Sequence, residues 1–531
     1  MQHKASVTLL LSLTLAIPTF AQRTRGPRVR PPESRPSTQE AAQGTQGEAA
    51  ADRLSVTDHE VTVHGQVLKY KATAGTLVMK DESDKPKANI FFVAYEKQPA
   101  SEDRSQRPIT FVFNGGPGAA AVWLHLGVAG PKRVGLDDQG DPPAPPYRLV
   151  DNDDTWLTAT DLVFIDPVGT GYSRPAPGEK PEQFYGVEED VRSVGQFIRT
   201  YLTRYQRWLS PRFLAGESYG TTRAAALSDF LMENGISLNG IVLISSVLNF
   251  ETISFANGND LPYALYLPSY TAIAWYHKKL PADLQADLSK ALKESEQWAL
   301  NGYLTALAAG ADVGKDDRQA AVKKLARLTG LPAAYVERAD LRVDPSEFRK
   351  QLLADDHRVL GRYDARLAGF DTDPLDRTPD YDPSLTAFRD AYSATFNDYV
   401  RRELGFESDL PYEVLSGRVH PWNFGTAGTG YLDVVGQLRS ALVQTPNLRV
   451  MFCSGLFDLA TPYLGTKYTV SHLDLGPNLR ENVSETFYDS GHMIYHHRAD
   501  RQKLSGNVAE FIRRAVPNSA VQQTAVPVKA E

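Results

Sequence analysis

Ser218 is a candidate nucleophile, because it stands between two glycines in the stretch GESYG, residues 216–220. The preceding run RFLAG is typical of a buried β-strand, and the following run TTRAAALSDFLMENG predicts a helix that ends at Gly235. A sharp strand–turn–helix junction exposes a serine hydroxyl as a nucleophile, and the helix N-terminus adds positive potential there. The pattern therefore predicts acyl transfer, and a serine in an ordinary bend is the alternative.

A serine hydroxyl needs a base, and the base needs a carboxylate that fixes its tautomer. In α/β-hydrolases these groups follow the serine in the order acid, then histidine, each at the end of a strand. Asp458 and His492 fit that order, because each follows an apolar run through a Ser-Gly turn. The rival residues lie too far past a strand, too near His492, or before Ser218: His496, His497, Asp489 and Asp166. Asp458 and His492 are therefore the predicted acid and base.

A glycine-rich turn, NGGPGAAA, follows the apolar run ITFVF upstream of the serine. Glycines allow main-chain N–H groups to approach a developing oxyanion closely. A phosphate-binding loop is the competing interpretation, but no Gly-Lys-Ser/Thr sequence follows. The turn is predicted to supply half of an oxyanion hole, and the N–H of Tyr219 the other half.

Two polar clusters could be mistaken for metal sites, namely His496-His497 and the aspartates of GFDTDPLDRTPDYDPS. Neither has the ligand spacing of a zinc or EF-hand site, so both are predicted to be solvated loops, and no metal or cofactor is expected. The net charge of −7 is spread along the chain without a basic stripe. This distribution argues against a nucleic-acid partner.

The segments around these motifs alternate between strands and helices. Short apolar runs predict buried parallel strands: PITFVFNGG, DLVFIDPVG, PRFLAGES, NGIVLISS, NLRVMFCSG and VSETFYDSGH. Between two of them, apolar residues recur at three- and four-residue steps from Val187 to Trp208, which indicates one face of a helix. Alternating runs before residue 100 predict further strands. The pattern predicts an α/β-hydrolase fold, a mostly parallel sheet with helices on both faces.

This rhythm is interrupted by helical sequence that is most simply a cap over the active-site edge of the sheet. We expect an α/β-hydrolase core at 54–259 and 441–517, a helical cap insertion at 260–440 and a flexible tail at 518–531. The segment 22–53 is rich in Pro, Arg, Gln and Gly and is predicted to be a disordered linker.

The first 21 residues predict a secretory signal peptide, with an apolar run from Val7 to Ile17 and cleavage after Ala21. We expect export to the periplasm or the medium and no integral membrane segment in the mature chain. Cys453 is the single cysteine, so no internal disulfide can form, which suits a bacterial exported protein. The oligomeric state is not indicated by the sequence.

Taken together, NGGPG, FIDPVGTGYS, GESYG, SGLFD and SGHM resemble the serine carboxypeptidase family, over residues 110–173, 211–246 and 447–495. The resemblance implies an enzyme that hydrolyses C-terminal residues from peptide substrates through an acyl-enzyme. The residue roles that it implies are the triad Ser218, Asp458 and His492, oxyanion donors Gly116 and Tyr219, and binding of the substrate carboxylate by Asn114 and Glu217. A glutamate beside a carboxylate must hold a proton, so activity at acid pH is implied.

The sequence departs from the family pattern at several positions: Val112 for a tryptophan, Ala119-Ala120-Ala121 for Cys-Ser-Ser, and Val128 for a glutamate. The carboxylate-binding network is therefore thinner than usual. An acyltransferase, an esterase or another α/β-hydrolase, and a non-hydrolytic binder or lyase on the same scaffold remain alternatives. Met493 is expected to form an apolar wall of the substrate pocket, with ordinary core packing as the alternative.

Overall fold

The computed structural model describes residues 51–425 and 430–516. The predicted signal peptide, the predicted linker as far as residue 50 and the predicted tail lie outside these residues. No helix in the described part of the chain is both long and apolar enough to span a bilayer.

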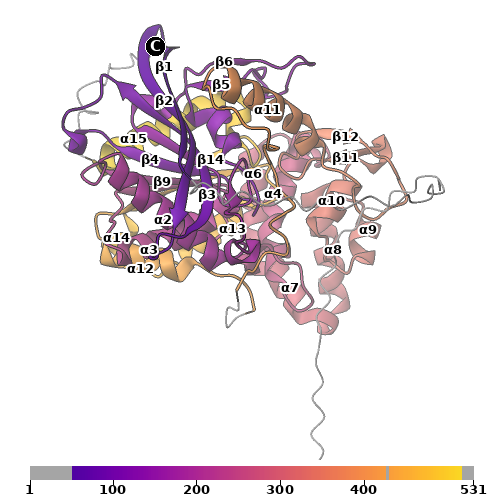
Figure 1. Ribbon diagram of the computed structural model, residues 1–531. Coiled ribbons are helices and arrows are strands. Elements are labelled where there is room, and N and C mark those ends of the chain that lie inside the picture. Colours follow the sequence, from indigo (N-terminus) through magenta and orange to yellow (C-terminus); the bar gives the residue numbers. More distant parts are fainter. Residues whose placement is uncertain (1–50, 426–429, 517–531) are drawn as a thin grey trace, which may run out of the picture. The chain divides into compact units, whose positions relative to one another are not determined.

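A ten-stranded sheet organises the described chain (Figure 1). In spatial order the strands are β1 (Arg53–Val63), β2 (Gln66–Lys80), β3 (Pro86–Gln98), β7 (Asp161–Ile165), β4 (Ile109–Phe113), β9 (Arg212–Glu217), β10 (Gly240–Ile244), β13 (Arg449–Gly455) and β14 (Val483–Tyr488), with β8 (Arg174–Pro175) beside β3. The pairs from β1 to β7 are antiparallel, and every pair from β7 to β14 is parallel. The predicted mostly parallel sheet and all predicted strands are confirmed.

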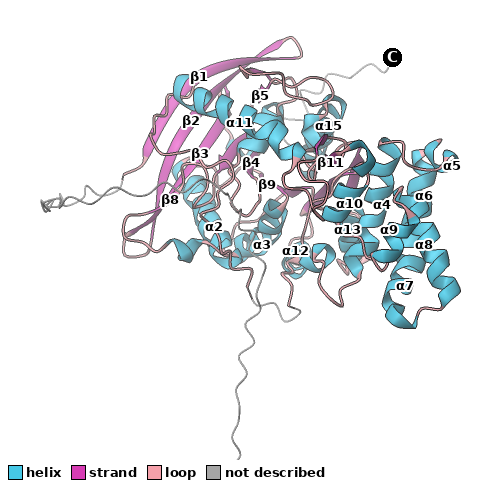
Figure 2. Ribbon diagram, turned by 90° about the vertical axis from the view of Figure 1, so that its right-hand side faces the viewer, coloured by secondary structure: helices cyan, strands magenta, loops and turns pink. Residues whose placement is uncertain are grey.

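Apolar residues alternate between the two faces of the central strands, as the pleat requires. In β9, Phe213 and Ala215 join one buried cluster with α1 (Val122–Leu124), α11 (Pro383–Arg402) and α15 (Arg498–Ala515). Leu214 joins the opposite cluster with α2 (Val187–Arg204), α3 (Tyr219–Glu233) and α12 (Val435–Gln444). Helices therefore cover both faces of the sheet, as predicted for an α/β-hydrolase fold (Figure 2).

Helix α2 illustrates how the sequence pattern becomes packing. Val187, Val194 and Ile198 are buried against the sheet, and acidic residues in the first turn favour the helix N-terminus. The helix ends at Arg204, so the prediction that Trp208 continues its apolar face is wrong. Trp208 is 39% exposed, because the chain has already turned towards β9.

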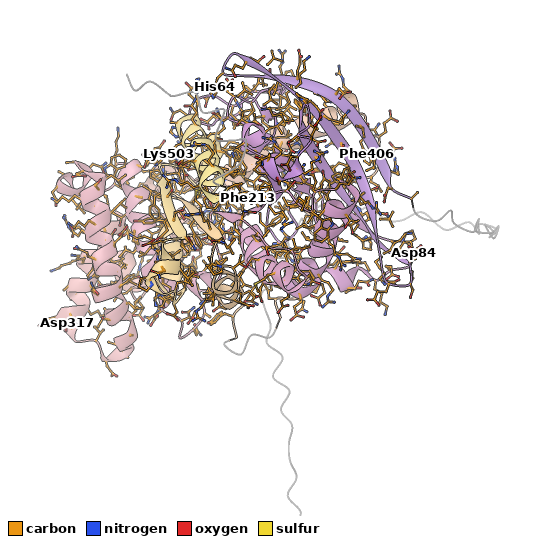
Figure 3. All side chains as sticks on the ribbon, turned by 90° about the vertical axis from the view of Figure 1, so that its left-hand side faces the viewer. His64, Asp84, Phe213, Asp317, Phe406 and Lys503 are labelled. Carbon is orange, nitrogen blue, oxygen red and sulfur yellow. The ribbon has the colours of Figure 1, made fainter. Side chains whose placement is uncertain are left out.

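Between residues 260 and 440 most elements are helices. Those that share a third buried cluster are α4 (Leu261–Tyr276), α6 (Leu288–Trp298), α7 (Leu304–Ala309), α8 (Lys315–Thr329), α9 (Ala333–Arg338) and α10 (Pro345–Gln351), with α5 (Ala282–Gln285) contributing Leu284. Residues of α13 (Tyr463–Ser471) complete that cluster. Figure 2 shows these helices side by side, and Figure 3 places Asp317 of α8 well away from Phe213 of β9. Helix α11 instead joins the buried cluster on one face of the sheet, where the Tyr399 hydroxyl lies 3.1 Å from that of Tyr95 in β3.

Small elements complete the fold. They are two short hairpins, β5 (Lys132–Val134) with β6 (Leu149–Asp151) and β11 (Arg358–Leu360) with β12 (Ala368–Phe370), and the short helix α14 (Pro477–Arg480). The turn with His64 joins β1 to β2 and the turn with Asp84 joins β2 to β3, at opposite ends of these long strands (Figure 3).

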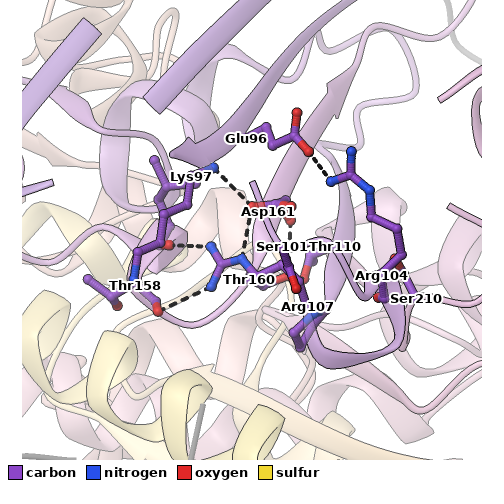
Figure 4. A network of polar contacts seen from close by, with 12 residues as sticks. Glu96, Lys97, Ser101, Arg104, Arg107, Thr110, Thr158, Thr160, Asp161 and Ser210 are labelled. Atoms are coloured by element: carbon purple, nitrogen blue, oxygen red, sulfur yellow. Dashed lines mark hydrogen bonds and ion pairs between the residues drawn. The ribbon is translucent and has the colours of Figure 1, made fainter. Parts of the chain in front are cut away.

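A buried ionic network fixes the amino ends of the central strands. Asp161, the first residue of β7, accepts hydrogen bonds from Arg107 at 2.9 Å and Arg207 at 2.8 Å. Arg107 also donates to the carbonyls of Leu157 and Thr158 (Figure 4). Since this network occupies one end of β7 and β4, the opposite end, where the strands finish, is the edge left for chemistry.

Candidate active site

Four parallel strands end at one edge of the sheet, and each leads into a predicted site residue. The order is β4 before Asn114, β9 before Ser218, β13 before Asp458 and β14 before His492. Carboxyl ends of parallel strands share one edge, so motifs separated by hundreds of residues meet there.

Ser218 occupies a tight turn between β9 and α3, with φ of 60° and ψ of −131°. A Cβ on Gly216 would lie 2.2 Å from the carbonyl oxygen of Gly220, and a Cβ on Gly220 would lie 2.9 Å from that of Phe113. Both positions therefore require glycine. The Ser218 N–H donates to the Ile244 carbonyl at 3.0 Å, which ties the turn to β10. This strained junction has the geometry of a nucleophile elbow.

Asp458 and His492 form a buried pair. His492 Nδ1 lies 2.7 Å from Asp458 Oδ2, and Asp458 is fully buried. The second carboxylate oxygen, Oδ1, accepts the N–H groups of Ala460 at 2.6 Å and Thr461 at 3.0 Å, while the Thr461 hydroxyl donates to Oδ2 at 2.7 Å. These donors hold the carboxylate in one orientation, which a tautomer-fixing acid requires.

The main chain and the charges around His492 fix its position and its basicity. The backbone N–H of His492 donates to the Tyr363 carbonyl at 2.6 Å, and the backbone carbonyl of His492 accepts a hydrogen bond from the Ser245 hydroxyl at 2.6 Å. Burial lowers the pKa of His492, but the charge and hydrogen bond of Asp458 outweigh burial and raise the pKa above its usual value. The buried Nε2 has no hydrogen-bond partner among the described residues. His492 and Ser218 line one cavity, and such contacts commonly tighten when substrate binds.

The NGGPG turn packs directly against the serine turn. A Cβ on Gly115 would lie 2.4 Å from the Tyr219 nitrogen, and Gly116 has a φ of +98°. Tyr219 is the first residue of α3, so its N–H has no partner within the helix. Gly116 and Tyr219 both line the cavity. The NGGPG turn and the serine turn thus meet at one cavity wall, where backbone N–H groups could serve as an oxyanion hole.

We expect Gly115→Ala to lower kcat/KM by at least about 100-fold, because the added Cβ must displace the Tyr219 backbone beside Ser218. The measurement is peptidase kinetics together with the melting temperature. Gly436→Ala in α12 is the control, since nothing lies within 4 Å of its added Cβ. Wild-type kinetics in Gly115→Ala would contradict this close packing.

Asn114 and Glu217 form a second buried pair beside the serine. Asn114 Nδ2 donates to Glu217 Oε1 at 3.1 Å, and Asn114 Oδ1 accepts the Leu124 N–H at 3.1 Å. Burial raises the pKa of Glu217 to about 7, although His492, Tyr495 and Asn114 each lower it. Glu217 is therefore largely protonated at mildly acid pH, so it can donate a hydrogen bond to an anion.

A cavity of about 160 Å³ joins these groups. Its lining contains seven predicted site residues: Asn114, Gly116, Glu217, Ser218, Tyr219, His492 and Met493. Asp458 lies behind His492 and is absent from the lining. The remaining wall is largely apolar, and its members from distant segments include Trp123, Phe250, Ile253, Leu385, Leu415 and Phe424.

The sequence interpretation did not identify several polar residues of the site, among them Thr461, which lines the cavity and donates to Asp458. Arg362 and Tyr363 line the cavity from the segment between β11 and β12, and Tyr495 affects the pKa of Glu217. Tyr495 lies two residues after Met493, so its position just past the SGHM motif was a usable signal. Arg362 and Tyr363 carried none, because nothing in their local sequence places them at the sheet edge.

The rival residues have other environments. His496 is buried against Phe388, and burial lowers its pKa to about 3, so the prediction of a solvated loop is wrong for this residue. His497 pairs with Asp500 at 2.8 Å. Asp166 accepts the Ala121 N–H at 2.8 Å, and burial raises its pKa to about 7. Within residues 51–425 and 430–516, no group of three or more His, Cys, Asp or Glu side chains is arranged to hold a metal ion.

Comparison with known proteins agrees with this geometry. A family model described as serine carboxypeptidase matches residues 64–513. Serine carboxypeptidase-like 34 of Arabidopsis thaliana is 24% identical over 195 residues, 35% of this chain and 36% of the plant protein. Venom serine carboxypeptidase of Apis mellifera is 26% identical over 218 residues, 39% of this chain and 41% of that protein. The chain thus matches about two fifths or less of the length of these relatives.

Among solved structures, the chain is similar to Kex1(delta)p, a prohormone-processing carboxypeptidase from Saccharomyces cerevisiae. The TM-score is 0.51 at 16% identity, covering 83% of this chain and 91% of that chain. At this identity the likeness concerns the fold, and it agrees with the α/β-hydrolase sheet described above.

Proposed function

The chain belongs to the serine carboxypeptidase family, and from that premise we propose that it releases C-terminal residues from peptides by acyl transfer through Ser218. The observation that carries the proposal is the shared cavity. It joins the serine turn, His492 with its buried Asp458 partner, and the protonatable pair Asn114–Glu217.

In the proposed reaction His492 Nε2 takes the proton of the Ser218 hydroxyl as Oγ attacks the scissile carbonyl. The N–H groups of Gly116 and Tyr219 stabilise the oxyanion that forms. His492 then gives the proton to the leaving amine, so the C-terminal residue departs and an ester to Ser218 remains. Water, deprotonated by the same imidazole, hydrolyses this acyl-enzyme and restores the serine.

Asn114 and Glu217 bind the terminal carboxylate of the substrate in this proposal. Glu217 is protonated below its pKa of about 7 and donates a hydrogen bond to the carboxylate. Above that pH it is ionised and repels the substrate. At the acid end, His492 must be neutral to act as base, so its raised pKa limits kcat/KM as pH falls.

We expect the KM of wild-type enzyme for free-acid dipeptides to rise roughly tenfold per pH unit above about pH 7, whereas Glu217→Gln shows a KM independent of pH in that range. The glutamine keeps a hydrogen-bond donor but cannot ionise. The measurement is amino-acid release from N-blocked dipeptides with free or amidated C-termini, between pH 5 and 9.

The amidated substrates are the matched control, because they carry no charge for Glu217 to bind. Selective cleavage of free acids supports carboxypeptidase action. Equal cleavage of acids and amides would contradict carboxylate binding and favour an esterase-like hydrolase. Cleavage of neither, with transfer from activated esters to alcohols, would favour an acyltransferase.

The N-terminal sequence further supports export of a bacterial enzyme to the periplasm or medium. The segment 260–440 supplies Arg362, Leu385 and Leu415 to the cavity wall, which supports its role as a cap that shapes the substrate pocket. Peptides are the proposed substrates.

A further inference from the structure

The segment Gly361–Arg366 lies between the two loops that carry the acid and the base. The Arg362 carbonyl accepts the Leu459 N–H at 3.1 Å, one residue past Asp458, and the Tyr363 carbonyl accepts the His492 N–H at 2.6 Å. On the other side, the Arg362 N–H donates to Asp382 Oδ1 at 3.1 Å. The backbone of Arg362 is therefore held in place from both sides.

The guanidinium of Arg362 is left without an ion-pair partner. Arg362 is an exposed residue of the cavity lining, and its guanidinium lies over the Tyr363 ring at 5.6 Å. Among the described residues no carboxylate accepts a hydrogen bond from it, and the acidic groups whose charges reach it are Asp382 and Asp458. By contrast, Arg366 in the same segment is paired with Asp364 at 2.6 Å.

The acidic groups nearest Arg362 already have other hydrogen-bond partners. Asp382 caps α11, where its Oδ1 accepts the Ser384 N–H at 3.0 Å and the Ser384 hydroxyl at 2.6 Å. Asp458 is fully buried and paired with His492. Glu217 and His492 of the lining are both neutral in the state that binds substrate and starts the reaction. Burial raises the pKa of the lining tyrosines, Tyr219 and Tyr363, so they are neutral as well. Arg362 is thus the permanent positive charge of the cavity.

We propose that Arg362 binds an acidic side chain of the peptide substrate, on one of the two residues that flank the scissile bond. This rests on the proposed function, in which Asn114 and Glu217 already bind the terminal carboxylate. A planar guanidinium with free donors suits a second carboxylate, and it stays charged at the mildly acid pH at which Glu217 is protonated. The enzyme is then selective for Asp or Glu beside the cleaved bond.

The test compares glutamate with glutamine, which differ in charge and little in shape. Four N-blocked, free-acid dipeptides carry Glu or Gln at the C-terminal or the penultimate position, and kcat/KM is measured at about pH 6. Glutamate side chains are ionised there, because their usual pKa is about 4.3. We expect wild-type enzyme to prefer Glu about 10- to 100-fold in one of the two pairs, and that pair identifies the position.

Arg362→Gln should bring that ratio close to one, and Arg362→Lys should retain part of the preference. Arg358→Gln is the control, because it removes the same charge from an exposed arginine outside the cavity lining. Absence of a Glu preference in wild type, or an equal loss on all four substrates in Arg362→Gln, overturns the proposal. If wild type releases no residue from any free acid, the proposed function itself fails.

Discussion

Ser218→Ala is expected to lower kcat by about 10⁶-fold and to leave KM for free-acid dipeptides nearly unchanged. The variant removes the atom that forms the acyl-enzyme, while the cavity and the Asn114–Glu217 pair persist. Ser218 sits at a φ of 60°, which alanine tolerates about as well as serine, so the fold should be maintained. Single-turnover release of the C-terminal amino acid is the measurement.

Ser471→Ala is a suitable control, because Ser471 is an exposed serine at the end of α13. A fluorophosphonate probe should label wild type and the control on the peptide that contains Ser218, and it should leave Ser218→Ala unlabelled. Residual activity of Ser218→Ala above about one thousandth of wild type would exclude Ser218 as the nucleophile.

The sheet and its site edge could be predicted because each strand carries its own local signal. Apolar runs such as RFLAG and RVMFC are followed by turn residues, and parallel strands place those turns together regardless of sequence distance. The serine turn had an additional signal, the glycines at 216 and 220, where an added Cβ would lie only 2.2 and 2.9 Å from backbone carbonyl oxygens.

The parts that could not be predicted depend on contacts between distant segments. Arg362 reaches the cavity because its carbonyl accepts the N–H of Leu459 in the loop after β13. These two residues lie roughly a hundred positions apart in the sequence, and no local pattern encodes such a contact. Trp208 fits a helical face, yet the helix ends four residues earlier as the chain turns into β9. The elevated pKa of Glu217 arises from burial, which only the folded structure defines.

Asp458→Asn is expected to lower kcat by about 10⁴-fold, because the amide would hold His492 in the wrong tautomer. The N–H groups of Ala460 and Thr461 both face Oδ1, so the asparagine carbonyl must occupy that position. The amide NH₂ then faces His492 Nδ1 and donates to it. The imidazole proton moves to Nε2, which can no longer accept the proton of Ser218.

Two readouts distinguish this positioning role of Asp458 from a merely structural one. A low-field proton resonance from Nδ1–H should be present in wild type and absent in Asp458→Asn, with KM little changed. If Ser218, His492 and Asp458 act as one unit, adding Asp458→Asn to Ser218→Ala should cause little further loss of kcat. The tautomer of His492 affects kcat only while Ser218 has a proton to give. A double variant whose kcat falls a further 10⁴-fold below that of Ser218→Ala would therefore mean that Asp458 acts independently of the serine.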